Sequence, residues 1–170
     1  MREIDSPAAE AGRVRRATAE DAPALVRLRG LMLAAMDIPT GPEQAPWRAD
    51  AHTWFLERLG RPEEFAAFLV EDFELGVVSC AVGICDRHAP GPTNRSGLHG
   101  HVFNVSTDPR RRGRGHARAC LDALLTWFAE DTGARVVNLN ATADGAGLYR
   151  SLGFVAPRFP ALQLRIDTGA

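Results

Sequence analysis

A proline, an arginine run and two glycines stand between a β-rich segment and an apolar-striped segment, and this order restricts how the chain can fold. Residues 102–107 favour a strand, and Pro109 ends it because proline fixes its own φ and lacks a backbone N–H. Gly113 and Gly115 follow. Apolar residues then recur at the spacing of one helix face: Ala117, Cys120, Leu121, Leu124, Leu125 and Phe128. The pattern predicts a strand, a glycine-rich turn and a helix.

The predicted turn is suited to an anion. The first four amides of a helix have no partner inside it, and its N-terminus carries partial positive charge. Gly113 and Gly115 lack a Cβ, so a phosphate can approach the main chain. The surrounding arginines are Arg110, Arg111, Arg112, Arg114 and Arg118. The spacing fits neither a P-loop nor a Rossmann fingerprint. A tight turn with a solvated arginine patch is the alternative interpretation.

Two segments carry a family resemblance. Residues 112–117, Arg-Gly-Arg-Gly-His-Ala, resemble the coenzyme A pyrophosphate loop of the GNAT-type N-acetyltransferases, Arg/Gln-x-x-Gly-x-Gly/Ala. A second register over residues 110–115 also fits, but the offset from Pro109 favours the first. Residues 148–154, Leu-Tyr-Arg-Ser-Leu-Gly-Phe, are similar to the family's Leu-Tyr-x-x-x-Gly-Phe segment. Residues 14–22 resemble the family's first strand and helix start, so the resemblance covers most of the chain.

The resemblance implies a mixed α/β fold in a single domain. We expect a central, mostly antiparallel sheet of about seven strands, with strands 4 and 5 splayed apart and about four flanking helices. The last strands are expected near Phe154 and over residues 162–166. Residues 1–12 are expected to form a loose tail, and residues 13–170 a single acetyl-CoA-binding domain.

The resemblance also implies how acetyl-CoA, the expected cosubstrate, is held. The pyrophosphate is expected at Arg112, Gly113, Arg114, Gly115, His116, Ala117 and Arg118. The pantetheine arm is expected to add to the strand before the turn by main-chain hydrogen bonds, at Val105, Ser106 and Thr107. The family usually has Val where Thr107 stands, and many relatives carry Asn where Thr142 stands.

Acetyl transfer to an amine requires a held thioester, a neutral amine and a proton for the leaving thiolate. Tyr149 is the only tyrosine in the chain and stands at the family's tyrosine position, so we expect it to protonate the thiolate. His101 is the candidate base because an imidazole pKa of about 6.5 suits that task. Alternatively, His99 and His101 line an exposed strand. The candidate substrate-binding residues are Asn104, Asn138 and Trp54, for which strand-edge or core roles are the alternatives.

Composition narrows the classes of function. The chain has 20 basic and 21 acidic residues, so no global attraction to nucleic acid or an anionic membrane is expected. Its arginine run lacks the interleaved aromatic residues of a nucleic-acid site. No apolar stretch reaches the roughly 18–20 residues of a membrane span, and a cytoplasmic location is expected. Cys80, Cys85 and Cys120 lack metal-ligand spacing and indicate reduced thiols, so no metal is expected.

The sequence therefore predicts an N-acetyltransferase that moves an acetyl group from acetyl-CoA to a primary amine of a small molecule, by direct attack in a ternary complex. Two alternatives stay open: acetylation of a protein or peptide amine, and an acyl-CoA-binding sensor without turnover. A nucleic-acid-binding module built on the arginine patch is disfavoured by the near-zero net charge and the lack of interleaved aromatic residues. The sequence does not distinguish a homodimer from a monomer. No motif identifies the acceptor.

Overall fold

The computed structural model describes residues 12–166. The chain divides after Asn140 into two compact units, whose described parts are residues 12–140 and 141–166. Of the loose tail predicted over residues 1–12, all but Gly12 lies outside the described residues, so that expectation stays a prediction.

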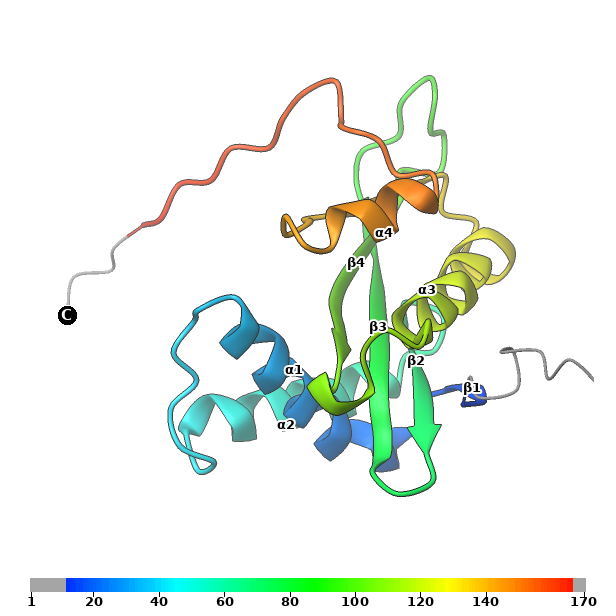
Figure 1. The fold of residues 1–170 in the computed structure, drawn as a ribbon. Coiled ribbons are helices and arrows are strands. Elements are labelled where there is room, and N and C mark those ends of the chain that lie inside the picture. The colour runs from blue at the N-terminus through cyan, green and yellow to red at the C-terminus, as the bar shows by residue number, and fades with distance from the viewer. Residues whose placement is uncertain (1–11, 167–170) are drawn as a thin grey trace, which may run out of the picture. The chain divides into compact units, whose positions relative to one another are not determined.

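The first unit is built on one five-stranded sheet (Figure 1). Its strands are β1 (Val14–Arg16), β2 (Phe65–Asp72), β3 (Gly76–Arg87), β4 (Leu98–Thr107) and β5 (Val136–Leu139). The strands lie in chain order across the sheet. β1 to β4 pair antiparallel, whereas β5 pairs parallel to β4. β2 and β3 are almost continuously apolar because both of their faces are covered.

The described chain has four α-helices. Those of the first unit are α1 (Ala22–Ala35), α2 (Pro46–Leu59) and α3 (His116–Trp127), and α4 (Ala146–Ser151) belongs to the second unit. Shorter helical turns span Ala19–Asp21, Pro109–Arg111 and, in π-helical form, Phe128–Thr132. Before α1, the Thr18 amide donates to Asp21 Oδ2 at 2.8 Å, which closes a capping box. α1 and α2 each carry a proline in the first turn, where no N–H is needed.

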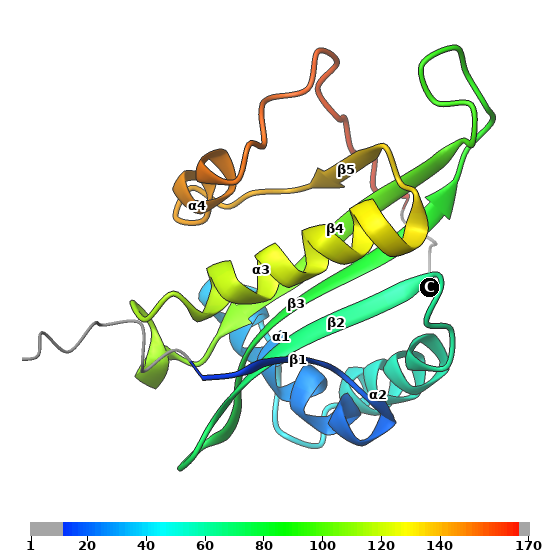
Figure 2. The same ribbon diagram turned by 90° about the vertical axis from the view of Figure 1, so that its right-hand side faces the viewer.

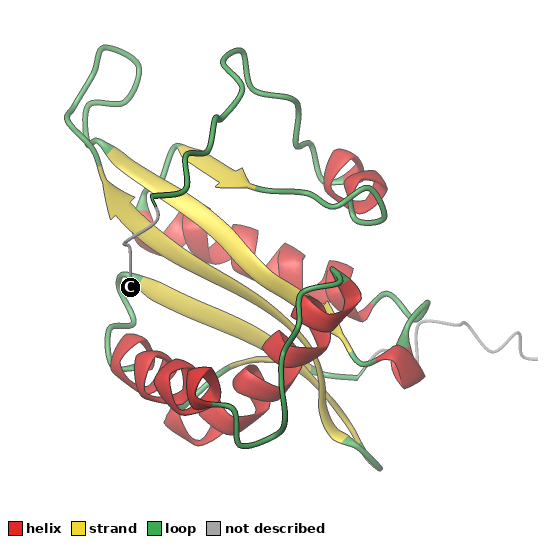
Figure 3. Cartoon of the chain, turned by 90° about the vertical axis from the view of Figure 1, so that its left-hand side faces the viewer, coloured by secondary structure: helices red, strands yellow, loops and turns green. Residues whose placement is uncertain are grey.

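Helices cover both faces of the sheet (Figures 2 and 3). α1 and α2 pack on one face, above a core that includes Leu25, Leu28, Phe55, Phe65, Leu69 and Val82. α3 packs on the opposite face. There, Gly83 and Gly100 make room for Phe128: a Cβ on Gly100 would lie 2.6 Å from the Phe128 ring. These two glycines therefore let the end of the helical segment approach the sheet.

The mixed α/β fold and the four α-helices are confirmed, but the count of seven strands is wrong. In the described part of the chain the sheet has five strands, and residues 152–166 form none. Leu162, Leu164 and Ile166 alternate as a strand would, yet their exposed fractions are 98%, 83% and 80%. Alternation of this kind separates two faces but supplies no hydrogen-bonding partner, which is why the pattern alone overpredicted strands.

Candidate active site

The chain leaves β4 through a short, anchored turn. Asp108 is only 3% exposed and accepts a hydrogen bond from the Arg110 amide at 3.0 Å, which starts the helical turn Pro109–Arg111. The Asp108 amide donates to the Val78 carbonyl at 2.7 Å. The chain then passes through two glycines into α3. The predicted strand, glycine-rich turn and helix are confirmed.

Consecutive unpaired backbone amides mark the start of α3. The amides of residues 113–117 donate no hydrogen bond to any group of the described chain. The helical ladder starts when the Ala119 amide donates to the Gly115 carbonyl at 3.0 Å. Because these donors add to the partial positive charge of the helix N-terminus, the turn can bind an anion with several acceptor atoms.

The two glycines of the turn are required by its backbone conformation. Gly113 has a φ of +74° and Gly115 a φ of +79°, values that residues with a Cβ adopt only with strain. A Cβ built on either glycine would meet no atom within 4 Å. The glycines therefore shape the turn and leave open space beside the unpaired amides.

The arginines around the turn fall into two groups. Arg110 is held by Asp108 at 3.0 and 2.9 Å. Arg111 donates through Nη2 to Asp72 at 3.2 Å and to Glu74 at 2.8 Å. These two arginines hold the turn in place through their ion pairs. They therefore do not belong to the arginines that would surround a bound anion. The second group, Arg112, Arg114 and Arg118, is exposed, although Arg112 Nε donates to the Thr107 carbonyl at 3.4 Å and Arg118 lies 3.9 Å from Asp122.

The ion pairs keep their carboxylates charged. Hydrogen bonding from Arg111 lowers the pKa of Asp72 to about 2. Hydrogen bonding from Arg110 lowers the pKa of Asp108 well below its usual range. Both carboxylates are therefore ionised near neutral pH, and the turn keeps its anchors there.

The His116 side chain is buried, although this residue opens α3. It is 5% exposed, and its Nδ1 has no hydrogen-bond partner in the described chain. Burial, and after it the charge of Arg114, lowers the pKa of His116. The imidazole is therefore neutral at neutral pH, and the backbone amide is the part of His116 that suits an anion.

β4 offers an open edge immediately before the turn. Its ladder with β5 runs only from His99 to Val102, so within the described part of the chain residues 103–107 have no partner strand on that side (Figure 2). The predicted splay of strands 4 and 5 is confirmed. Val105, Ser106 and Thr107, the predicted pantetheine contacts, lie on this open part. The Thr107 hydroxyl lies 2.8 Å from Ser79 Oγ, so its polar group has a partner.

β4 bulges at Asn104 and Val105. The register with β3 shifts between Cys80 and Val82, so that β4 contributes one residue more than its partner. Asn104 has a φ of +54° and is 3% exposed, and its carbonyl accepts a hydrogen bond from Cys80 Sγ at 3.1 Å. Asparagine tolerates positive φ better than most residues. Strained residues and bulges are frequent beside functional sites, where they redirect a side chain.

Three predicted site residues gather on the face of the sheet that carries α1 and α2. The His101 ring stacks on Phe103, with ring centres 6.1 Å apart and planes inclined by 13°. Phe103 meets Trp54 of α2 edge-on at 5.8 Å. Asn138 of β5 is in register with His101, which puts both side chains on one side of the sheet. His101, Trp54 and Asn138 are thus brought together around the β4 edge.

Trp54 also belongs to the core. Its ring meets Phe55 at 5.3 Å and Phe65 at 5.8 Å, both edge-on. The core role weighed from the sequence is therefore present.

Sequence reasoning missed Arg29 of α1. Its Nη1 donates to Asn104 Oδ1 at 3.3 Å, and the side chain is partly buried. Arg27, two residues earlier, pairs with Asp108 at 3.3 Å and donates to the Val77 carbonyl. An arginine on a helix is usually solvated, so no sequence signal marks Arg29.

In the second unit, Tyr149 lies near the end of α4. Its ring is partly buried and edge-on to Phe154, with ring centres 6.0 Å apart. Burial raises the pKa of Tyr149, so the phenol is protonated at neutral pH. In the turn before this helix, Thr142 Oγ1 accepts a hydrogen bond from the Gly145 amide at 3.2 Å. The residue that stands in place of the family's Asn thus has a structural role.

The described residues contain no group of three or more His, Cys, Asp or Glu side chains that could hold a metal ion. Cys80, Cys85 and Cys120 are free thiols, and burial raises the pKa of Cys120 to about 12. Among the described helices, none combines the length and apolar character that crossing a membrane requires.

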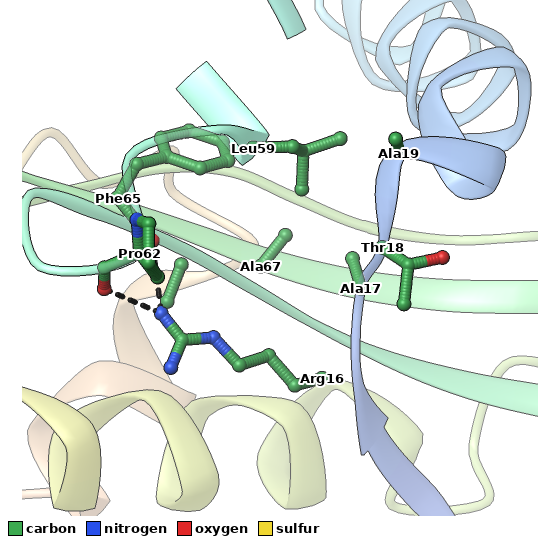
Figure 4. A pocket seen from close by; sticks show the side chains of 9 residues that line it. Arg16, Ala17, Thr18, Ala19, Leu59, Pro62, Phe65 and Ala67 are labelled. Carbon is green, nitrogen blue, oxygen red and sulfur yellow. Dashed lines mark hydrogen bonds between the residues drawn. The ribbon is translucent and has the colours of Figure 1, made fainter. Parts of the chain in front are cut away.

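A separate pocket lies beside β1, the start of β2 and the end of α2 (Figure 4). Arg16 donates there to the carbonyls of Pro62 and Phe65 at 2.6 and 3.1 Å. The other lining residues are Ala17, Thr18, Ala19, Leu59, Ala66 and Ala67. The pocket shares no residue with the turn or the β4 edge, so we assign it no part in the chemistry.

Known proteins resemble the chain in family and in fold. The acetyltransferase (GNAT) family matches residues 30–154. A predicted acetyltransferase with acetyl-CoA from Clostridium acetobutylicum is 24% identical, with 90% of this chain and 95% of that chain covered and a TM-score of 0.78. A GCN5-related N-acetyltransferase from Ralstonia eutropha JMP134 is 21% identical, with coverage of 89% and 97% and a TM-score of 0.73.

Glucosamine-6-phosphate N-acetyltransferase from Arabidopsis thaliana has the same fold at 15% identity, with coverage of 92% and 98% and a TM-score of 0.70. No curated protein matches the chain in sequence.

The sheet opens between two parallel strands, next to a helix N-terminus with amides unpaired in the described chain, and the acetyltransferases of known structure named above share this fold. The chain belongs to the acetyltransferase (GNAT) family. The family resemblance drawn from residues 112–117 and 148–154 is thereby confirmed, and the protein is an enzyme of acetyl transfer.

Proposed function

We propose that the protein transfers the acetyl group of acetyl-CoA to a primary amine of a small molecule by direct attack in a ternary complex. The row of unpaired amides over residues 113–117, next to the open β4 edge, carries the proposal. A diphosphate presents several acceptor oxygens to such a row, and the sequence contains no lysine that could serve instead.

The coenzyme would run from the turn along β4. Its pyrophosphate would bind the amides of residues 113–117, with charge supplied by the exposed Arg112, Arg114 and Arg118. The pantetheine arm would add to the edge of residues 105–107 as an extra strand, using main-chain hydrogen bonds. This direction leads from the turn toward the bulge at Asn104.

The chemical step needs a base and an acid. The amine nitrogen attacks the thioester carbonyl carbon, and we assign the proton it loses to His101. The carbon–sulfur bond breaks, and we assign the proton that the thiolate gains to Tyr149. The role of Tyr149 rests on the motif of residues 148–154 and on a raised pKa that keeps the phenol protonated. Asn104, Asn138 and Trp54 are proposed to contact the acceptor.

Thiol release with acetyl-CoA and a panel of primary amines tests this function, with amino acids, peptides and protein N-termini in the same panel. We expect turnover with one or more small amines and binding of acetyl-CoA by calorimetry. Turnover with peptides alone would show that the acceptor is a protein or peptide amine. Binding of acetyl-CoA with no thiol release for any amine would show that the protein is an acyl-CoA-binding sensor without turnover.

A further inference from the structure

Arg29 is a partly buried cation whose charge is not balanced by an acid. Among residues 12–166, its hydrogen-bond partner is the neutral amide oxygen of Asn104, and no carboxylate lies within ion-pair distance. Burying a charge without a counter-ion is costly. The neighbouring Arg27 shows the usual solution, because it pairs with the buried Asp108. Burial without such a pair lowers the pKa of Arg29.

The surroundings of Arg29 belong to the proposed acceptor side of the sheet. Asn104, its partner, is held rigidly in the bulge at positive φ. The preceding residue, Phe103, stacks with His101 and meets Trp54. These neighbours are neutral amide, imidazole and aromatic groups. The guanidinium next to them has no carboxylate partner in the described chain, whereas Arg27 of the same helix pairs with Asp108.

The Arg29 guanidinium also has N–H donors that no described residue accepts. Arginine carries five N–H donors in a planar fork that matches a carboxylate with two parallel hydrogen bonds. Only Nη1 donates to a described residue, and it does so at 3.3 Å, near the long limit of a hydrogen bond. Most of the fork is therefore available to a ligand.

We infer that Arg29 binds a carboxylate of the acceptor, so that the enzyme acetylates amines that carry a negative charge in the same small molecule. This inference rests on the proposed function and narrows its substrate class. The carboxylate would pair with Arg29 beside Asn104, while the amine would lie toward His101. The acceptor would thus be a small molecule that carries both an amino group and a carboxylate.

Matched amines test the inference. We would compare phenylalanine with phenethylamine, and leucine with 3-methylbutylamine, so that each pair differs only in the carboxylate. The proteins would be the wild type, Arg29→Gln and Arg29→Lys, with Arg61→Gln as the control, because Arg61 is an exposed arginine in a long ion pair with Glu64. The readouts are kcat/KM by thiol release and the affinity for acetyl-CoA.

In the wild type and in Arg61→Gln, we expect kcat/KM to favour the carboxylate-bearing member of a pair by about 10- to 100-fold, the range of a charge-assisted hydrogen bond. Arg29→Gln should lose this preference while keeping its affinity for acetyl-CoA. Arg29→Lys should restore part of the preference, because it returns the charge without the fork.

Three outcomes overturn the inference. One is an equal kcat/KM for both members of every pair in the wild type, and another is an undiminished preference in Arg29→Gln. The third is a preference for phosphate-bearing amines over carboxylate-bearing amines when both are supplied. Each of these leaves turnover intact, so it differs from failure of the proposed function, in which no amine releases thiol. If Arg29→Gln does not fold, the wild-type comparison and Arg29→Lys decide.

Discussion

Replacing Ala117 by proline should delete one of the unpaired amides and leave α3 in place. Ala117 is the second residue of this helix, and proline lacks an N–H but is tolerated in a first turn. α1 and α2 already carry proline at such positions. The Ala117 amide makes no hydrogen bond within the described chain, so the substitution breaks no bond of the folded protein.

The size of the effect follows from the number of bonds lost. A hydrogen bond to a charged acceptor contributes about 1.5–3 kcal/mol. Because about 1.4 kcal/mol corresponds to tenfold in affinity, losing one amide should weaken acetyl-CoA binding by about 10- to 150-fold. Proline disfavours a helical conformation in the residue before it, here His116, so a loss of folding stability of up to about 1 kcal/mol is expected as well.

Calorimetric titration with acetyl-CoA measures the effect, and Ala117→Thr is the matched control because it adds atoms but keeps the amide. Acetyl-pantetheine, which lacks the diphosphate, should bind the wild type and both variants alike. Equal affinities of Ala117→Pro and Ala117→Thr for acetyl-CoA would refute the role of this amide. A loss of affinity confined to acetyl-pantetheine would mean that the substitution acts on the β4 edge instead.

Three further predictions concern catalysis and stability. Tyr149→Phe should lower turnover by about 10²- to 10⁴-fold with acetyl-CoA binding unchanged, as thiol release and calorimetry would show. Asp72→Asn removes a carboxylate whose pKa Arg111 lowers to about 2. The ion pair between Asp72 and Arg111 stabilises the fold above about pH 4 and is lost toward about pH 2. The stability of the variant, measured in denaturant titrations, should therefore fall less over this pH range than the stability of the wild type. Gly100→Ala should destabilise the protein by about 1–3 kcal/mol in urea unfolding, because its Cβ would lie 2.6 Å from the Phe128 ring.

Each of these predictions has a clear contrary result. An unchanged turnover number in Tyr149→Phe would remove the acid role. Parallel stability curves for Asp72→Asn and wild type between about pH 4 and pH 2 would mean that the ion pair contributes nothing to folding. A stabilised Gly100→Ala variant would show that the sheet and Phe128 do not meet as closely as described.

The turn and the strand before it could be predicted because local rules determine them. Pro109 cannot continue a ladder, and glycine is the residue that takes a φ of +74° or +79° without strain, so the pattern of Gly113 and Gly115 fixes the conformation. The apolar stripe behind them fixes the face that α3 buries. The turn that we propose as the cosubstrate site was therefore predictable from one continuous stretch of chain.

The proposed acceptor side depends on contacts between distant segments, which a single sequence does not reveal. Arg29 lies 75 residues before its partner Asn104, and Arg111 lies 39 residues after its partner Asp72. A run of arginines looks uniform in sequence, although its members have different partners in space. The same limit explains the overpredicted strands over residues 152–166, where alternation was visible but pairing was not.

Hydrogen exchange of the backbone amides tests most directly whether a coenzyme diphosphate binds the main chain at the start of α3. In the free protein, the amides of residues 113–117 should exchange fast, because they donate to no described group. Saturating acetyl-CoA should slow exchange at these amides, and acetyl-pantetheine should not. If acetyl-CoA binds while exchange over residues 113–117 stays as fast as in the free protein, the coenzyme lies elsewhere and the proposed site is wrong.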